Sequence, residues 1–184
     1  MKIIEFSGMP RCGKTTVLNL LEHYSDDFVF YGEKFDLVPF KDESSYEYNL
    51  WYANYCIDRL KQFKDNKIYL LDRSILDRIA FGWALTSFGK FTVKQNEKYQ
   101  AVLEPYVCKQ DLTFVRNISP ELSLKNAIGY KKMITRDLVF LKHLNSAYAN
   151  LERKYKNVYY IPENLDTENC LKYVIKILDT KNFY

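Results

Sequence analysis

The sequence predicts an α/β protein in which helices cover a parallel β-sheet, and three observations support this. Short apolar runs alternate with longer stretches of helical periodicity along the whole chain, which is typical of repeated strand–helix–strand units. A glycine-rich loop, residues 8–15, separates the first apolar run from the first helical stretch. The chain has 184 residues, of which 47% are hydrophobic, so it can bury one substantial core. We therefore expect a single domain spanning residues 1–184.

Five apolar runs have the length of buried strands. They are Lys2–Ser7, Phe28–Tyr31, Lys67–Leu71, Asp111–Ile118 and Val158–Ile161. No internal repeat, low-complexity tract or linker interrupts the series, which agrees with one domain.

Helical periodicity fills the intervals between these runs. Helices are expected at Thr15–Tyr24, Ser44–Phe63 and Ser74–Ser87. Ser74 and Asp77 have the spacing of a capping box, and Pro120 after Ser119 marks another helix start, because proline is tolerated at the first helical position.

The C-terminal third predicts a loop followed by a helix. From Asp137 onward one apolar stripe at helical spacing predicts a long helix packed on the sheet. Its members are Leu138, Leu141, Tyr148, Leu151 and Tyr155. The preceding segment, residues 126–136, is called the lid segment below; it has few apolar residues and contains Gly129, Lys131, Lys132 and Arg136. We expect it to close over an anion.

Composition excludes several classes of protein. The formal net charge is +4, with both signs spread along the chain, so charge gives no support to nucleic-acid binding. The four cysteines, Cys12, Cys56, Cys108 and Cys170, have neither zinc-site spacing nor the density of a disulfide framework. No stretch approaches the roughly 18 apolar residues of a membrane span, and the N-terminus has no signal-peptide pattern. We expect a cytoplasmic protein without a membrane segment.

The glycine-rich loop fits the Walker A pattern in its required context, between a strand and a helix. Glycines let backbone N–H groups turn toward a phosphate, and the helix that follows adds its N-terminal dipole. Lys14 is expected to reach the β- and γ-phosphates, and the Thr15 hydroxyl is expected to bind Mg²⁺. The expected nucleotide-binding residues are Gly8, Met9, Pro10, Arg11, Cys12, Gly13, Lys14, Thr15 and Thr16.

Asp72 follows the third expected strand, Lys67–Leu71, at the carboxyl edge of the sheet, where we expect the first strand as its neighbour. Its carboxylate is therefore the second expected magnesium ligand. The next residue is Arg73, where many ATPase motors carry a glutamate that activates water. The sequence also has no Asn-Lys-x-Asp motif and no Asp-x-x-Gly switch, so a GTPase is not supported.

At this point the chain resembles the nucleoside and nucleotide kinases, in particular the thymidylate kinase and deoxynucleoside kinase branch. The resemblance rests on Glu33 after the second strand, on Asp72-Arg73-Ser74 after the third, on the segment Asp111–Leu122 and on the cations of the lid segment. It implies a three-layer P-loop NTPase fold with a five-stranded parallel sheet and a short lid. It also implies ATP and Mg²⁺, a nucleoside or nucleotide acceptor, and a possible homodimer.

The chemistry that the resemblance implies is phosphoryl transfer, with Lys14, Glu33, Arg73 and Arg136 as catalytic residues. Glu33 would be the general base on an acceptor hydroxyl. If the acceptor were a phosphate, no base would be needed, and Lys34 and Arg73 would bind the anion. The sequence leaves both alternatives open.

The resemblance also implies that the helix Ser44–Phe63 helps form the acceptor pocket. Trp51 and Tyr55 lie one turn apart and could stack on a base whose edge Asn54 reads; the alternative is a packed aromatic face. Two other functions compete with a kinase. One is a P-loop ATPase or nucleotide-dependent switch without a small acceptor, and the other is a nucleotide-binding module without activity.

Overall fold

A parallel sheet forms the centre of the computed structural model, which describes residues 1–64, 66–127 and 134–183. Within these ranges the sheet has five strands in the order β2-β3-β1-β4-β5, and every pair of neighbours is parallel. The strands are β1 (Lys2–Gly8), β2 (Phe28–Tyr31), β3 (Ile68–Asp72), β4 (Leu112–Arg116) and β5 (Val158–Tyr160). The expected α/β class and parallel sheet are confirmed.

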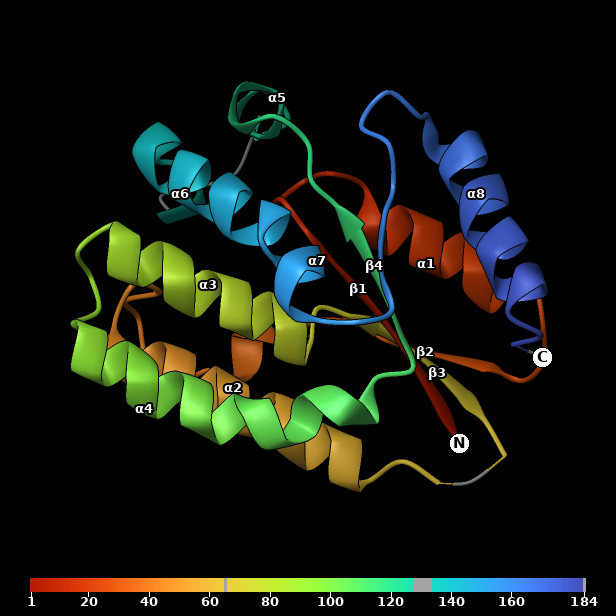
Figure 1. The fold of residues 1–184 in the computed structure, drawn as a ribbon, viewed down its shortest axis with the longest axis horizontal. Helices are drawn as coiled ribbons and strands as arrows, with labels where there is room; N and C mark the ends of the chain where they lie inside the picture. The colour runs from red at the N-terminus through yellow and green to blue at the C-terminus, as the bar shows by residue number, and fades with distance from the viewer. Residues whose placement is uncertain (65, 128–133, 184) are drawn as a thin grey trace.

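Helices cover both faces of the sheet (Figure 1). One face carries α1 (Lys14–Glu22) and α8 (Thr167–Thr180). The other carries α2 (Tyr46–Lys61), α3 (Ile75–Ser87), α4 (Val93–Leu103) and α6 (Leu138–Ala149). Shorter elements are α5 (Pro120–Lys125), α7 (Leu151–Lys154) and the 3₁₀ helices η1 (Phe35–Leu37), η2 (Glu104–Lys109) and η3 (Ile134–Arg136). The three-layer architecture is therefore confirmed.

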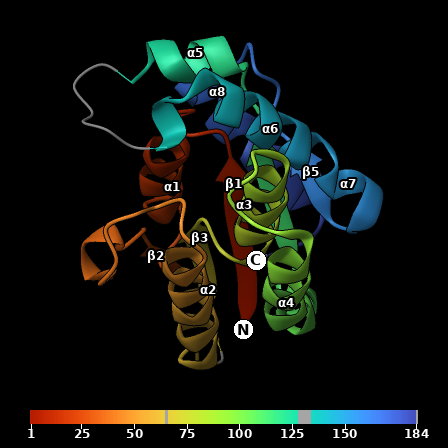
Figure 2. The same ribbon diagram turned by 90° about the vertical axis from the view of Figure 1, so that its left-hand side faces the viewer.

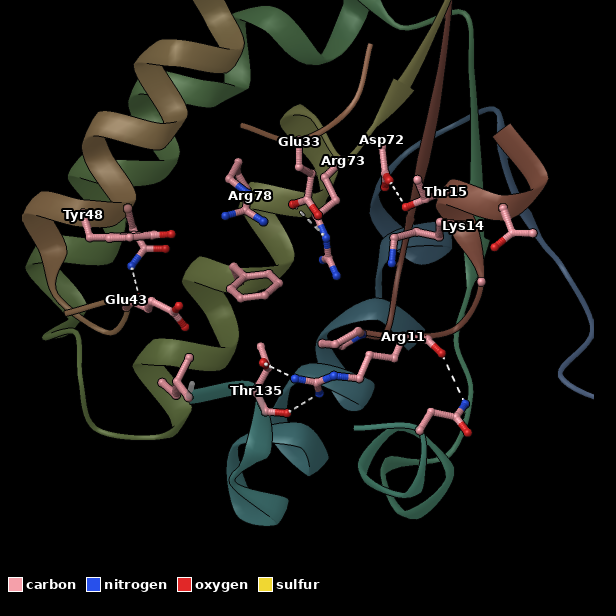
Figure 3. Close-up of a pocket in the computed structure, with 17 residues that line it drawn as sticks. Arg11, Lys14, Thr15, Glu33, Glu43, Tyr48, Asp72, Arg73, Arg78 and Thr135 are labelled. Atoms are coloured by element: carbon pink, nitrogen blue, oxygen red, sulfur yellow. Dashed lines mark hydrogen bonds and ion pairs between the residues drawn. The ribbon is translucent and has the colours of Figure 1, made fainter. Parts of the chain in front are cut away.

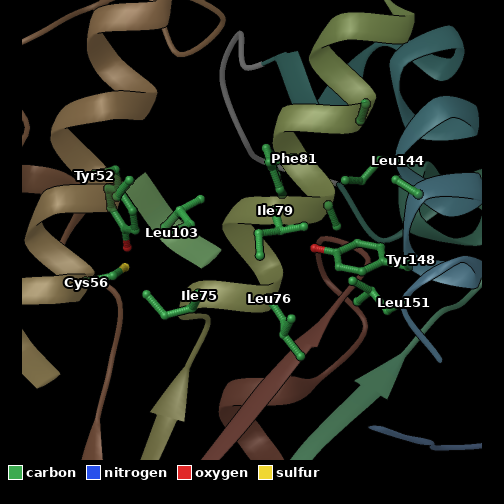
Figure 4. Packing of buried hydrophobic residues seen from close by; sticks show 14 of the residues in the cluster. Tyr52, Cys56, Ile75, Leu76, Ile79, Phe81, Leu103, Leu144, Tyr148 and Leu151 are labelled. Carbon is green, nitrogen blue, oxygen red and sulfur yellow. The ribbon is translucent and has the colours of Figure 1, made fainter. Parts of the chain in front are cut away.

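Successive side chains of β1 point to opposite faces of the sheet, and the core has one half on each face. Ile4 and Phe6 pack with α1 and α8, whereas Ile3 packs with the cluster under α2, α3 and α6. Figure 4 shows part of this second cluster, where Tyr52 of α2 and Tyr148 of α6 lie on either side of α3. Glu5 points to the same side as Ile3, so a carboxylate lies within an apolar half-core.

The P-loop lies where β1 ends. Figures 1 and 2 both place α5 at the end of the molecule toward which β1 points, and the Ser123 hydroxyl of α5 donates to the Pro10 carbonyl. β1 pairs with β3 on one side and with β4 on the other, so the strand order changes direction next to β1. Open parallel sheets usually bind ligands at the carboxyl ends of the strands where the order changes direction.

Several sequence predictions about helices need correction. Ser74 precedes α3 as expected, but its side chain makes no capping hydrogen bond, and the Asp77 carboxylate pairs with arginines instead of closing a capping box. The helix after Asp137 is interrupted: α6 ends at Ala149 and α7 begins at Leu151. Ser119 does cap α5, through the N–H of Leu122.

Two helices were not expected from the sequence, α4 and α8. Both helices begin after a capping residue that is typical of helix starts: Thr92 and Gln95 form a capping box before α4, and Asp166 caps α8. Among the described residues, no helix combines the length and the apolar character that crossing a bilayer requires.

Candidate functional site

The P-loop curls through residues with positive φ. Gly8 has φ +127°, Arg11 +59° and Gly13 +89°, and Gly13 is the N-cap of α1. At Gly8 a Cβ atom would lie 2.2 Å from the main-chain oxygen of Arg116 in β4, so only glycine fits. The glycines of the motif thus serve the turn that the sequence analysis assigned to them.

Lys14 is buried within this curl. Its Nζ donates to the carbonyl oxygens of Gly8 at 3.2 Å and Met9 at 3.0 Å, and it lies 3.6 Å from the Cys12 sulfur. The ammonium group is therefore held at the mouth of the loop, where a phosphate would meet it.

A cavity of about 480 Å³ opens beside the P-loop (Figure 3). It is lined by Pro10, Arg11, Gly13, Lys14, Thr15, Thr16, Glu33, Glu43, Tyr48, Asn49, Asp72, Arg73, Arg78, Phe81, Asn126, Ile134 and Thr135. In Figure 3, Lys14, Thr15 and Asp72 lie at one end, Tyr48 and Glu43 at the other, and Glu33, Arg73 and Arg78 between them.

Most of the expected site residues meet in this cavity, but some do not. Gly8, Met9 and Cys12 shape the loop from within and do not line the cavity. Arg136 is exposed and also does not line it. Lys131 and Lys132 of the lid segment lie outside the described residues.

Thr15 and Asp72 lie together as a magnesium site would require. The Thr15 hydroxyl donates to Oδ2 of Asp72, and the other oxygen, Oδ1, is buried without a hydrogen-bond partner among the described residues. Those residues hold no cluster of three or more histidine, cysteine, aspartate or glutamate side chains that could hold a metal ion. Mg²⁺ often takes only one or two carboxylates and completes its shell with water and substrate phosphates. The available oxygen ligands therefore fit Mg²⁺.

Glu33 and Arg73 form an ion pair in the wall of the cavity, with Nε of Arg73 3.0 Å from Oε1 of Glu33. Burial raises the pKa of Glu33 to about 7; Arg73 and Arg78 act against this rise, and Asp72 and Asp77 add to it. A carboxyl group with a pKa near neutrality can accept a proton from a substrate.

The main chain around this pair is fixed by hydrogen bonds. Arg73 has φ +58°, and its N–H donates to the Phe6 carbonyl at 3.0 Å. The buried side chain of Arg59 donates to the carbonyls of Arg73 at 2.9 Å and Gly32 at 3.3 Å. Arg59 therefore ties together the two loops that carry the ion pair.

The far end of the cavity uses a different face of α2 from the one expected. Trp51 and Tyr55 stack on each other, with ring centroids 5.6 Å apart and planes 4° apart, and they do not line the cavity. Asn54 is exposed. Tyr48 and Asn49 face the cavity instead, so the packed aromatic face was the better of the two interpretations.

Other lining residues were missed by the sequence analysis. Arg78 lies over the rings of Tyr52 and Phe81, at 4.7 Å and 4.5 Å from their centroids, and pairs with Asp77. Arg11, by contrast, was an expected nucleotide-binding residue; it donates to the carbonyl of Thr135 at 3.0 Å, which brings the P-loop against η3. The sequence signal for Arg78 was its place as a cation on the expected helix Ser74–Ser87, where it is the fourth residue of α3.

No model of a known protein family matches the chain. The chain is similar to a protein described as probable thymidylate kinase 1 of Saccharolobus solfataricus, with 23% identity over 197 positions that cover all of this chain and 99% of the relative.

Solved structures give a closer likeness in fold. A deoxyadenosine kinase from M. mycoides with bound dATP superposes with a TM-score of 0.79 at 14% identity, covering 97% of this chain and 100% of that chain. The same enzyme with bound dCTP gives 0.78 at 14% identity, and with dCMP and dCDP as products it gives 0.76 at 15%. The resemblance expected from the P-loop, Glu33 and the Asp72-Arg73-Ser74 triplet is thus confirmed: the chain has the P-loop NTPase fold of a deoxynucleoside kinase.

Proposed function

We propose that the protein is a kinase that moves the γ-phosphoryl group of ATP to a hydroxyl group of a nucleoside or a similar small molecule. One observation carries the proposal: the Glu33–Arg73 ion pair faces the same cavity as the P-loop lysine, Lys14. The names of the similar proteins, a probable thymidylate kinase and a deoxyadenosine kinase, support an acceptor of nucleoside or nucleotide chemistry.

On the donor side, the P-loop residues Gly8 to Thr16 would hold the triphosphate. Lys14, fixed by the carbonyls of Gly8 and Met9, would neutralise charge on the transferring group. Arg11 lines the cavity on the same side and offers a second cation. Arg136 remains a proposed lid cation, although its exposed position gives it less support than Arg11 has.

Thr15 and Asp72 would hold Mg²⁺, and this is supported by Oδ1 of Asp72, which has no hydrogen-bond partner within the described part of the chain. When bound, the ion would neutralise phosphate charge and orient the phosphates.

On the acceptor side, the distribution of charge favours a hydroxyl over a phosphate. Arg73 is already paired with both Glu33 and Asp77, and Arg78 is paired with Asp77. Lys34, the other cation expected to bind an acceptor phosphate, is exposed and does not line the cavity. A dianionic phosphate at this position would also face the carboxylates of Glu33 and Glu43. An uncharged acceptor avoids this repulsion and gives Glu33 a proton to remove.

The test is an ADP-release assay with Mg-ATP and pairs of acceptors, each nucleoside beside its own monophosphate. Stimulation by a nucleoside supports the proposal, and stimulation by a monophosphate alone overturns the hydroxyl acceptor. Steady hydrolysis that ignores every acceptor would favour an ATPase.

A cytoplasmic location and a homodimer also stay proposals. The four cysteines are free thiols in the structure, which agrees with a reducing compartment.

A further inference from the structure

Glu5 is a fully buried carboxylate in the middle of β1, and the mechanism above makes no use of it. It accepts four hydrogen bonds. One comes from the Ser7 hydroxyl at 2.5 Å, and three come from the main-chain N–H groups of Ser74, Leu76 and Asp77 at 3.1, 3.2 and 2.8 Å. A carboxylate is expensive to bury, so a residue with this many partners has a specific task.

The three N–H groups belong to the start of α3. The first N–H groups of a helix have no partner within the helix, and a nearby side chain normally caps them. Ser74 stands at the N-cap but makes no capping hydrogen bond. Glu5 therefore caps α3 from a neighbouring strand, with its negative charge at the positive end of the helix dipole.

This cap holds the residues that contact the proposed general base. Arg73, which directly precedes the capped residues, has φ +58°, a left-handed conformation that is unfavourable for a residue other than glycine. The N–H of Asp77 is bound by Glu5, and the Asp77 carboxylate accepts from the Arg73 guanidinium at 2.8 Å. A chain of contacts thus runs from Glu5 through Asp77 and Arg73 to Glu33.

We propose that Glu5 is a positioning residue, which caps α3 across the sheet and thereby places Arg73 against Glu33. The proposal rests on the proposed kinase function, because Glu33 matters only if an acceptor hydroxyl is activated. It gives a reason for a charged residue within the apolar run Ile3-Ile4-Glu5-Phe6.

The test replaces Glu5 by glutamine, which keeps the size of the side chain and removes its charge. In this variant the NH₂ group of the amide replaces one carboxylate oxygen and cannot accept a hydrogen bond from the main-chain N–H groups of α3. We expect the start of α3 to shift and Arg73 to move away from Glu33. We expect kcat to fall on the order of 10²-fold, which is the usual effect of a small misplacement of catalytic groups. KM for ATP should stay unchanged, because Lys14 keeps its carbonyl partners.

A second readout separates positioning from general loss of stability. Arg73 holds down the pKa of Glu33, so its withdrawal moves the acidic limb of the pH profile of kcat/KM to higher pH. A variant that merely unfolds more easily loses activity in proportion to its folded fraction, and the acidic limb of its pH profile stays at the wild-type pH. Ser7→Ala is the matched control: it removes one donor to Glu5 and none of those on α3, and it should keep the wild-type kcat and pH profile.

The outcomes distinguish the two proposals. If the wild-type protein transfers phosphoryl groups and E5Q retains its kcat and pH profile, Glu5 has no positioning role and the kinase function stands. If the wild-type protein transfers nothing, both fail. Should E5Q not fold, Glu5→Asp, which keeps the charge and retracts it by one methylene, carries the same test.

Discussion

The guanidinium of Arg73 lies 3.0 Å from the Glu33 carboxylate through Nε and 2.8 Å from the Asp77 carboxylate through a terminal nitrogen. The two carboxylates differ in what they can do. The pKa of Asp77 is lowered: burial would raise it, but Arg73 and Arg78 outweigh burial. For Glu33 burial prevails, and its pKa rises. Neighbouring groups whose pKa values are driven apart are typical of sites that perform acid–base chemistry.

The first prediction concerns Glu33 itself. Glu33→Gln should lower kcat for transfer to a hydroxyl by about 10²–10⁴-fold, the usual contribution of a general base, while Mg-ATP still binds. Steady-state kinetics and calorimetric titration with Mg-ATP measure the two effects. Glu43→Gln is the control, because Glu43 lines the same cavity at its far end and should change kcat much less. Wild-type turnover in Glu33→Gln would remove Glu33 from the chemistry.

The second prediction concerns pH. Glu33 must be deprotonated to act as a base, and its pKa is about 7, so kcat/KM should fall about tenfold per pH unit below that value. Stability should change in the opposite direction. The unfolded chain releases this proton near pH 4.5 and the folded chain near 7, so the contribution of Glu33 to stability is present at low pH and is lost as pH rises between these values.

Denaturant unfolding of the wild type and Glu33→Gln across this window checks the sign. The difference in stability between the two should move in favour of the variant as pH rises. A constant difference would mean that Glu33 ionises as it does in the unfolded chain.

The third prediction concerns the metal. Asp72→Asn keeps an oxygen but removes the charge, and it should raise the Mg²⁺ concentration required for half-maximal activity by about tenfold to a hundredfold. Activity measured against Mg²⁺ at fixed ATP gives this value. Asp36→Asn, at an exposed position outside the cavity, is the control. An unchanged Mg²⁺ requirement would exclude Asp72 as a ligand of the ion or of its water shell.

The fourth prediction concerns Arg59, which binds the carbonyls of Gly32 and Arg73. Arg59→Met fills similar space but leaves these carbonyls without a donor, at about 1–3 kcal/mol for each group that stays buried. We expect a lower Tm and a lower kcat together, since the loops of Glu33 and Arg73 are then free to separate. Lys61→Met removes an exposed ion pair on the same helix and should change neither quantity noticeably. If Arg59→Met lowered Tm alone, the carbonyl contacts would serve stability only.

The sequence predicted the parts of the site that follow from strand order. In a parallel sheet the carboxyl ends of strands share one edge, so Asp72, which follows the third expected strand, was expected beside the P-loop that follows the first. The loop glycines and the Thr15–Asp72 pair follow from this rule and the motif, whereas the Glu33–Arg73 neighbourhood was implied by the resemblance to nucleoside and nucleotide kinases.

Contacts on helix faces could not be predicted in the same way. The helix α2 has aromatic residues on more than one side, so periodicity alone could not tell that Tyr48 faces the cavity while Trp51 and Tyr55 stack on each other. The role of Glu5 depends on N–H groups of α3, which are distant in sequence. By contrast, α8 was predictable, because Cys170, Val174 and Leu178 recur at four-residue intervals after a capping aspartate.

The last prediction concerns the close approach at Gly8. Gly8→Ala places a Cβ atom 2.2 Å from the Arg116 carbonyl oxygen in a strand that cannot move without breaking its pairing with β1, and the backbone there has φ +127°. Gly89→Ala is the matched control, since Gly89 also has a positive φ, +78°, but no atom of the residues that the structure describes meets the added carbon within 4 Å.

Gly89→Ala should therefore cost only the backbone strain, about 1–2 kcal/mol, and keep ATP binding. Gly8→Ala should cost more than this in the free energy of unfolding, because steric overlap adds about 1–3 kcal/mol, and it should also weaken ATP binding. Denaturant unfolding and calorimetric titration with Mg-ATP measure both. Equal losses of stability in the two variants would mean that β4 yields to the added carbon, and that Gly8 is required for its backbone angles and not for its closeness to Arg116.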